Sequence, residues 1–140
     1  MLLLQLTAQV PYIGLLETFA LSNPATEKEL SRSAQPAPLD TDVWDMDEFI
    51  GSTHVSQAER DAFEAFEQIG LTDVVRPLIP DGYTYWDYQQ LRFPKNEGMR
   101  IDFILGSEAF AERVTSAEIV RDERKGEGPS DHVPVVVEIK

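Results

Sequence analysis

Three polar residues in the carboxy-terminal part of the sequence could do acid–base chemistry together. Asp131 and His132 stand side by side in PSDHVPV, and Asp102 interrupts the apolar run Ile101-Asp102-Phe103-Ile104-Leu105. A carboxylate that faces a core in such a run is strongly unfavourable unless it finds a partner. A carboxylate that hydrogen-bonds one nitrogen of an imidazole fixes the tautomer of the ring and raises its basicity. Asp102 opposite His132 would therefore form an acid–base pair.

The same residues also fit a purely structural interpretation. A buried Asp–His hydrogen bond, or an aspartate turn before a strand, accounts for them without catalysis, and from spacing alone we favour this interpretation. Neighbouring residues of a strand point to opposite sides, so Asp131 and His132 could also serve two roles at one sheet end. One would take a metal, and the other a proton or a phosphate.

The elements that must position these residues begin at Thr53. Ser56 to Glu59 is a capping box, and apolar residues then recur at helical spacing until Gly70, which predicts a helix over 57–69. Four β-prone runs and one short helical run at 107–114 follow. We expect strands at residues 83–88, 99–105, 117–120 and 133–139. This order predicts an α+β fold with antiparallel pairing.

Composition limits the possible classes of protein. With 140 residues, 42% of them hydrophobic, the chain is long enough for one folded domain. It has no cysteine, which excludes disulfides and leaves oxygen or imidazole groups as metal ligands. The start has no basic flank and only a short apolar run, so we expect neither a secretory signal nor a membrane partner, and a cytoplasmic protein. The net charge of −13 argues against binding nucleic acid by phosphate contacts alone.

Several motifs together resemble a known family. GMRIDFILGS and PSDHVPVVVEI, with DTDVWD, STHVSQAER, GLTDVVRP and YTYWDYQ before them, resemble the carboxy-terminal half of exonuclease III and the apurinic/apyrimidinic (AP) endonucleases. These belong to the endonuclease/exonuclease/phosphatase superfamily. The resemblance implies half of the four-layer α/β sandwich of the DNase I-like or exonuclease III fold, with a mostly antiparallel sheet and flanking helices. It covers residues 38–140 and leaves 1–37 as a segment without a match, poorly ordered or a short helix.

The resemblance also implies an activity and a site. The activity is Mg²⁺-dependent phosphodiester hydrolysis, with Mn²⁺ as the alternative metal, on double-stranded DNA with abasic sites or 3′ ends. Carried over by position, Asp131 resembles the carboxylate near the metal. His132 resembles the imidazole that contacts the scissile phosphate, and Asp102 the acid that orients it. We assign catalysis to these three residues, and metal binding to Asp131 and His132.

The DNA contacts implied by the resemblance come from an aromatic pair and an adjoining segment. Tyr85 and Trp86 fall where family members present aromatics to DNA and to the abasic sugar, and Met99 and Arg100 lie beside them. Packing within the sheet is the alternative for both aromatics, and the more so for Trp86. Further candidates for contacts with DNA phosphates are Arg92, Lys95, Arg100, Arg121, Arg124 and Lys125.

Departures from the family pattern favour impaired activity. Ser33 and Gln35 stand where the family has the Asp and Asn of a Gly-Asp-x-Asn motif, and Glu17 only faintly echoes its metal-binding Glu. A catalytic Tyr has no counterpart in register. We therefore expect a truncated DNA repair nuclease that turns over poorly, and that pairs with a missing amino-terminal half or with itself. The alternatives are a non-catalytic DNA- or partner-binding remnant and, less favoured, a phosphatase of the same superfamily.

Overall fold

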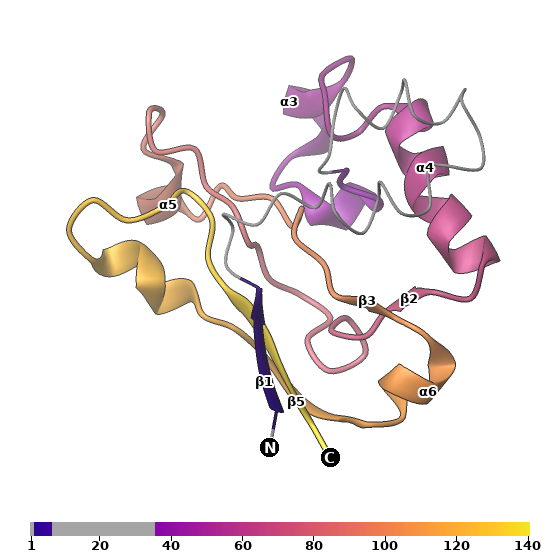
Figure 1. Cartoon of the computed structure of the whole chain (residues 1–140). Coiled ribbons are helices and arrows are strands. Elements are labelled where there is room, and N and C mark those ends of the chain that lie inside the picture. Colours follow the sequence, from indigo (N-terminus) through magenta and orange to yellow (C-terminus); the bar gives the residue numbers. More distant parts are fainter. Residues whose placement is uncertain (1, 7–35) are drawn as a thin grey trace.

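The sheet that carries the carboxy-terminal strand has three antiparallel strands. In the computed structural model, β1 (Leu2–Leu6), β5 (Val135–Ile139) and β4 (Val114–Ile119) lie in the order β1-β5-β4. The start of β1 and the end of β5 lie side by side, and Leu2 pairs with Ile139 (Figure 1). The structure describes residues 2–6, of which only the backbone is considered, and residues 36–140.

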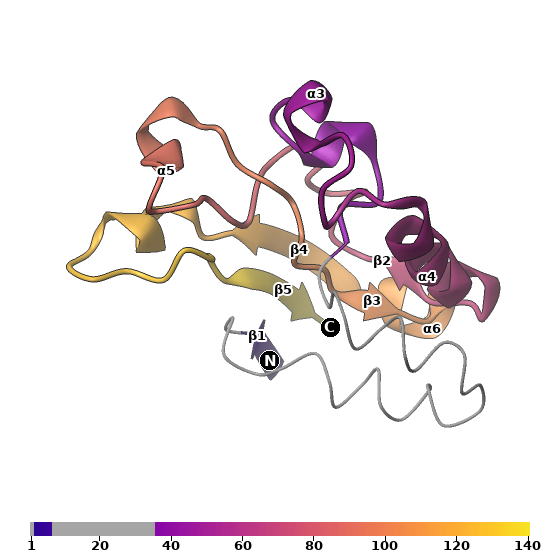
Figure 2. The same cartoon turned by 90° about the horizontal axis from the view of Figure 1, so that it is seen from above.

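Short elements surround this sheet. A second, two-stranded antiparallel sheet pairs β2 (Thr72–Asp73) with β3 (Leu105–Gly106). Figures 1 and 2 place α4 and α6 towards one end of the molecule and α5 towards the other. The helices are η1 (Asp40–Asp42), α3 (Met46–Phe49), α4 (Gln57–Gln68), α5 (Arg92–Lys95), α6 (Glu108–Ala111) and η2 (Arg121–Lys125).

The helix predicted over 57–69 is confirmed as α4. The Ser56 side chain accepts a hydrogen bond from the Glu59 amide, and the Glu59 carboxylate accepts one from the Ser56 amide, so the predicted capping box is formed. The helix buries Phe63, whose ring packs edge-on against Phe103 with the ring centroids 4.9 Å apart. This aromatic contact fixes α4 against the segment that contains Asp102.

Two of the four predicted strands are wrong as regular strands. Segment 83–88 forms only isolated bridges, in which Tyr85 pairs with Met99 and with His132. Segment 99–105 enters a ladder only at its end, in β3. The Arg100 amide donates to the carbonyl of Asp42, outside any ladder. The other two predicted strands are present, as β4 and β5.

Valines of β5 pack against segments outside the three-stranded sheet. Val135 and Val137 of β5 form one core cluster with Val74, Val75 and Ile104. Ile101 belongs to a second cluster, which also contains Ala37, Val43 and Met99. The described residues thus supply their own core, because segments 74–75 and 101–104 cover the sheet.

Some expectations lie outside the described residues. Most of segment 1–37, expected to be poorly ordered or a short helix, falls there, as do the positions of Glu17, Ser33 and Gln35, whereas residues 2–6 form β1. Within residues 2–6 and 36–140, no helix has the length and apolar character needed to cross a membrane.

Candidate active site

Asp102 and His132 form a direct side-chain pair. The distance from Oδ2 of Asp102 to Nδ1 of His132 is 2.8 Å, although 30 residues separate them in the sequence. Both side chains are largely buried, with 15% and 13% of their surface exposed. The structure therefore contains the contact between Asp102 and His132 that the sequence suggested. The catalytic roles of these two residues stay predictions.

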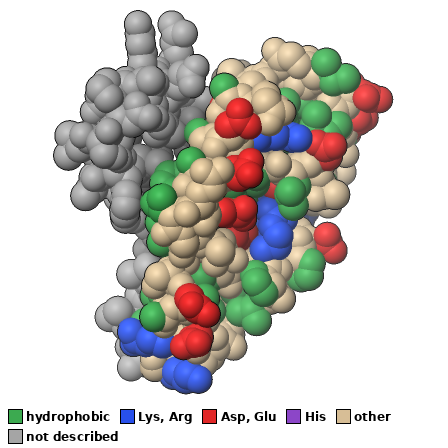
Figure 3. All heavy atoms as spheres, turned by 90° about the vertical axis from the view of Figure 1, so that its right-hand side faces the viewer, with side chains coloured by type: hydrophobic (Ala, Val, Ile, Leu, Met, Phe, Trp, Pro, Cys, Tyr) green, Lys and Arg blue, Asp and Glu red, His purple; other side chains and the backbone are tan. Residues whose placement is uncertain are grey.

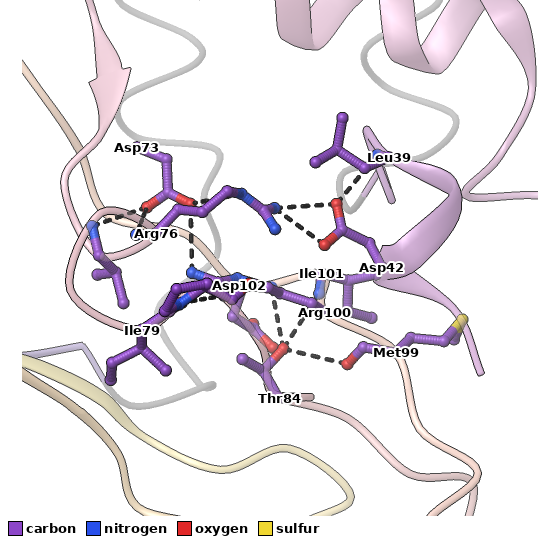
Figure 4. Close-up of polar contacts among 12 residues, drawn as sticks. Leu39, Asp42, Asp73, Arg76, Ile79, Thr84, Met99, Arg100, Ile101 and Asp102 are labelled. Atoms are coloured by element: carbon purple, nitrogen blue, oxygen red, sulfur yellow. Dashed lines mark hydrogen bonds and ion pairs between the residues drawn. The ribbon is translucent and has the colours of Figure 1, made fainter.

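The Asp102 segment is held by the hydroxyl of Thr84. Thr84 is fully buried, and its Oγ1 accepts hydrogen bonds from the amides of Ile101 and Asp102, each at 3.1 Å (Figure 4). One hydroxyl oxygen thus takes the place of the ladder partner that a regular strand would have supplied. Buried amides need such acceptors, so Thr84 fixes the backbone from which the Asp102 carboxylate projects.

The His132 segment is held by the same stretch of chain. The Val133 amide donates to the carbonyl of Thr84 at 2.8 Å, and the Trp86 amide donates to the carbonyl of Asp131 at 2.9 Å. The ring of Tyr85 lies edge-on to the His132 ring, with the centroids 4.9 Å apart. Segment 84–86 therefore lies between the two halves of the pair and contacts both.

The surroundings of His132 favour its protonated form. Burial lowers the pKa of the ring, but the hydrogen bond that the ring donates to Asp102 and the charges of Asp102 and Asp131 outweigh burial and raise the pKa above 6.5. In the neutral ring, the bond to Asp102 favours a proton on Nδ1 and leaves the lone pair on Nε2. Within the described part of the chain, Nε2 forms no hydrogen bond with protein, so it is the nitrogen that can bind a substrate.

Asp131 could supply one oxygen ligand to a metal. Its side chain is partly exposed, and among residues 36–140 it has no hydrogen-bond partner of its own. Mg²⁺ is usually held by one or two carboxylates together with water and substrate, and it prefers oxygen to nitrogen. The described residues contain no group of three or more His, Asp or Glu arranged to hold a metal ion. The carboxylate oxygen of Asp131 is the kind of ligand that Mg²⁺ prefers, whereas the imidazole nitrogen of His132 is not. Both metal assignments stay predictions.

Three of the four predicted DNA-contacting residues are buried. Trp86, Arg100 and Met99 expose 1%, 2% and 7% of their surface. Trp86 packs edge-on against Phe93, and Met99 belongs to the second core cluster. Burial of these three side chains is unfavourable for direct contact with DNA, whereas Tyr85 is only half-buried beside His132, and all four assignments stay predictions.

Arg100 instead belongs to a buried charge network. Its Nη2 lies 3.4 Å from Oδ2 of Asp73, and its Nη1 donates to the carbonyl of Ile79 at 2.7 Å (Figure 4). Arg76 continues the network, with Nη2 at 2.9 Å from a carboxylate oxygen of Asp42. Burial raises the pKa of Asp42 even though Arg76 lowers it. These contacts fix the chain two residues before Asp102.

Sequence reasoning missed the residues that hold the pair in place. Thr84 lies within YTYWDYQ, but nothing in that pattern distinguishes it from an ordinary β-prone residue. Asp73 lies within GLTDVVRP, where its carboxylate also accepts hydrogen bonds from the amides of Val75 and Arg76. An aspartate two residues before its amide partner is a recognisable turn signal, and it could have indicated this local structure.

Comparison with known proteins gives sequence and structural relatives. No family model matches the chain. Exodeoxyribonuclease III of Haemophilus influenzae is 40% identical over 85 residues, which are 59% of this chain and 32% of that protein. An AP endonuclease structure from Archaeoglobus fulgidus aligns with a TM-score of 0.70 and 30% identity, over 75% of this chain and 42% of the other. The 3′ phosphatase NExo from Neisseria, bound to a product DNA hairpin, aligns with a TM-score of 0.73 and 32% identity, over 94% and 56%.

These relatives confirm the predicted fold class, α+β with part of the exonuclease III fold. The chain spans about a third of the length of the curated relative that it matches. In sequence and in fold, the chain is a relative of exodeoxyribonuclease III and the AP endonucleases, matched over part of their length.

Proposed function

We propose that the chain takes part in DNA repair as a nuclease that hydrolyses phosphodiester bonds with Mg²⁺. The observation that carries this proposal is the 2.8 Å contact between Asp102 and His132, in a chain whose relatives are named exodeoxyribonucleases and AP endonucleases. The proposed substrate is double-stranded DNA with an abasic site or a 3′ end.

Each residue of the pair has a separate role in this proposal. Asp102 accepts a hydrogen bond from Nδ1–H of His132 and thereby fixes the direction of the imidazole. His132, favoured in its protonated form, donates from Nε2 to a non-bridging oxygen of the scissile phosphate and stabilises the charge that develops there. Bound Mg²⁺ would polarise the phosphate oxygens, with Asp131 as one of its ligands.

The net charge and the charge pattern of one face are consistent with a substrate held by a few specific groups. On the face shown in Figure 3, acidic side chains lie among Lys, Arg and hydrophobic side chains and do not leave a single positive patch. The net charge of −13 also opposes general attraction to phosphate. We therefore expect recognition to depend on the site, and weak binding without the divalent ion.

The test is nicking of a labelled duplex that contains one abasic site. Wild type, His132→Ala and Asp102→Asn are compared with Mg²⁺ and with EDTA, and a second arm adds the amino-terminal part of a related exonuclease III. We expect nicking that requires Mg²⁺ and falls by about 10²- to 10³-fold in His132→Ala, since removal of one hydrogen-bond donor to a developing charge costs about that much. Nicking that survives in His132→Ala would contradict the proposal. Salt-sensitive binding without nicking in either arm would instead support a non-catalytic DNA-binding module.

Removal of a 3′-terminal phosphate from DNA is a second candidate. The structural relative NExo is named a 3′ phosphatase and was bound to a product DNA hairpin. A terminal phosphate monoester, like an internal diester, presents non-bridging oxygens to which Nε2 of His132 could donate. A hairpin that ends in a 3′ phosphate, assayed beside the abasic duplex, separates the two activities, because phosphate release without nicking would favour the phosphatase.

A further inference from the structure

One cation of η2 is turned into the protein, unlike its neighbours. Arg124 exposes only 9% of its surface, whereas Arg121, Asp122, Glu123 and Lys125 are all exposed. A buried guanidinium requires compensating contacts, because removing a charge from water is strongly unfavourable. The contacts of Arg124 therefore indicate what its burial achieves.

Arg124 makes its contacts with a carbonyl and an aromatic ring. Its Nη1 donates a hydrogen bond to the backbone carbonyl of Ser130, and its guanidinium carbon lies 5.3 Å from the centroid of the Phe93 ring. Among the described residues, no carboxylate lies within ion-pair distance of it, and its Nε has no partner. The charge is thus directed at the backbone immediately before Asp131 and His132.

Ser130 also forms a hydrogen bond with His132. The Oγ of Ser130 accepts a hydrogen bond from the His132 amide at 3.1 Å. The segment before it, Gly126 to Pro129, lies outside any helix or strand, and Gly128 has a φ of 60°. A loop with two glycines can adopt many conformations, so it cannot by itself fix the residues that follow. Arg124 anchors the chain where this loop ends.

We propose that Arg124 is a positioning residue that holds the Ser130 carbonyl and thereby places His132 against Asp102. The catalytic part of this inference rests on the proposed nuclease function, whereas the positioning part does not. Lysine could donate one hydrogen bond to the same carbonyl, but it lacks the planar group that stacks on Phe93. The identity of the cation should therefore matter, as well as its charge.

The experiment compares Arg124→Met and Arg124→Lys with Arg121→Met as the matched control. Arg121 lies on the same helix and stacks on the same Phe93 ring at 4.2 Å, but it is exposed and has no hydrogen bond to Ser130. The first readout is backbone amide NMR of the full chain, with shifts and hydrogen exchange for residues 130–133. We expect the His132 amide to shift and to exchange faster in Arg124→Met, an intermediate effect in Arg124→Lys, and signals near wild type in Arg121→Met.

The second readout is steady-state nicking of the abasic duplex. Misplacement of a catalytic group by about 1 Å can lower a rate about 10²-fold, so we expect kcat to fall about 10- to 100-fold in Arg124→Met with KM within about twofold of wild type. If no variant nicks DNA, the nuclease function fails, but the NMR comparison still decides the positioning role. Unchanged His132 signals in both Arg124 variants, or equal changes in Arg121→Met, would overturn the inference. If Arg124→Met does not fold, Arg124→Lys alone decides it.

Discussion

Replacing Thr84 with valine would remove one hydroxyl from beneath the Asp–His pair and keep the shape of the side chain. In the native protein that hydroxyl accepts hydrogen bonds from the amides of Ile101 and Asp102, each at 3.1 Å, and Thr84 itself has no exposed surface. A buried donor that loses its acceptor costs about 1–3 kcal/mol. The Ile101 bond is fully buried and the Asp102 bond only partly. We therefore expect Thr84→Val to lower the free energy of unfolding by about 2–4 kcal/mol.

Thermal and urea unfolding followed by circular dichroism would measure this loss. In a chain of this size, 1 kcal/mol corresponds to about 4 °C in Tm, so we expect a decrease of about 8–16 °C. Thr84→Ser is the matched control, because it keeps the hydroxyl and loses one methyl group, which contributes about 1 kcal/mol. A valine variant within about 0.5 kcal/mol of wild type, or a serine variant destabilised as much as the valine variant, would refute the assignment of Thr84 as the acceptor of both amides.

Three further predictions concern stability. Burial alone would lower the pKa of His132, but the neighbouring carboxylates raise it above 6.5. Protonation of His132 therefore stabilises the fold, and this stabilisation is fully present below pH 6.5. It is lost as pH rises through the pKa of His132 in the folded state. In EDTA, the difference in unfolding free energy between wild type and His132→Gln should therefore shrink over that range, and a constant difference would contradict the raised pKa. Asp73→Asn should lower the free energy of unfolding by about 3 kcal/mol, because it leaves the Arg100 guanidinium without its carboxylate. The double variant with Arg100→Met should lose less free energy of unfolding than the sum of the two single variants. Strict additivity of these losses in urea unfolding would argue against the ion pair. Phe63→Ala should lower the free energy of unfolding by about 3–5 kcal/mol in the same measurement. Ile69→Ala, at an exposed position at the end of α4, should stay within about 0.5 kcal/mol of wild type. Similar losses in both variants would contradict the packing described for α4.

Local signals in the sequence were sufficient for some parts of the fold. The capping box and the helical spacing located α4, because helix initiation depends on residues three or four positions apart. The valine-rich segment near the carboxy terminus was correctly predicted as a strand, since β-branched residues favour extended backbone. Asp102 and His132 could also be chosen from the sequence, because a charge inside an apolar run requires a partner.

Tertiary structure decided the rest of the site. Whether Asp102 reaches His132 depends on segment 84–86, which joins two stretches of chain that lie far apart in the sequence. Thr84 and Arg124 act on backbone groups that any residue type would present, so their partners exist only after folding. The sequence by itself determined which side chains are candidates for the chemistry and where α4 forms. The fold decided which of them are buried and which meet, because long-range hydrogen bonds and packing leave no mark in local sequence patterns.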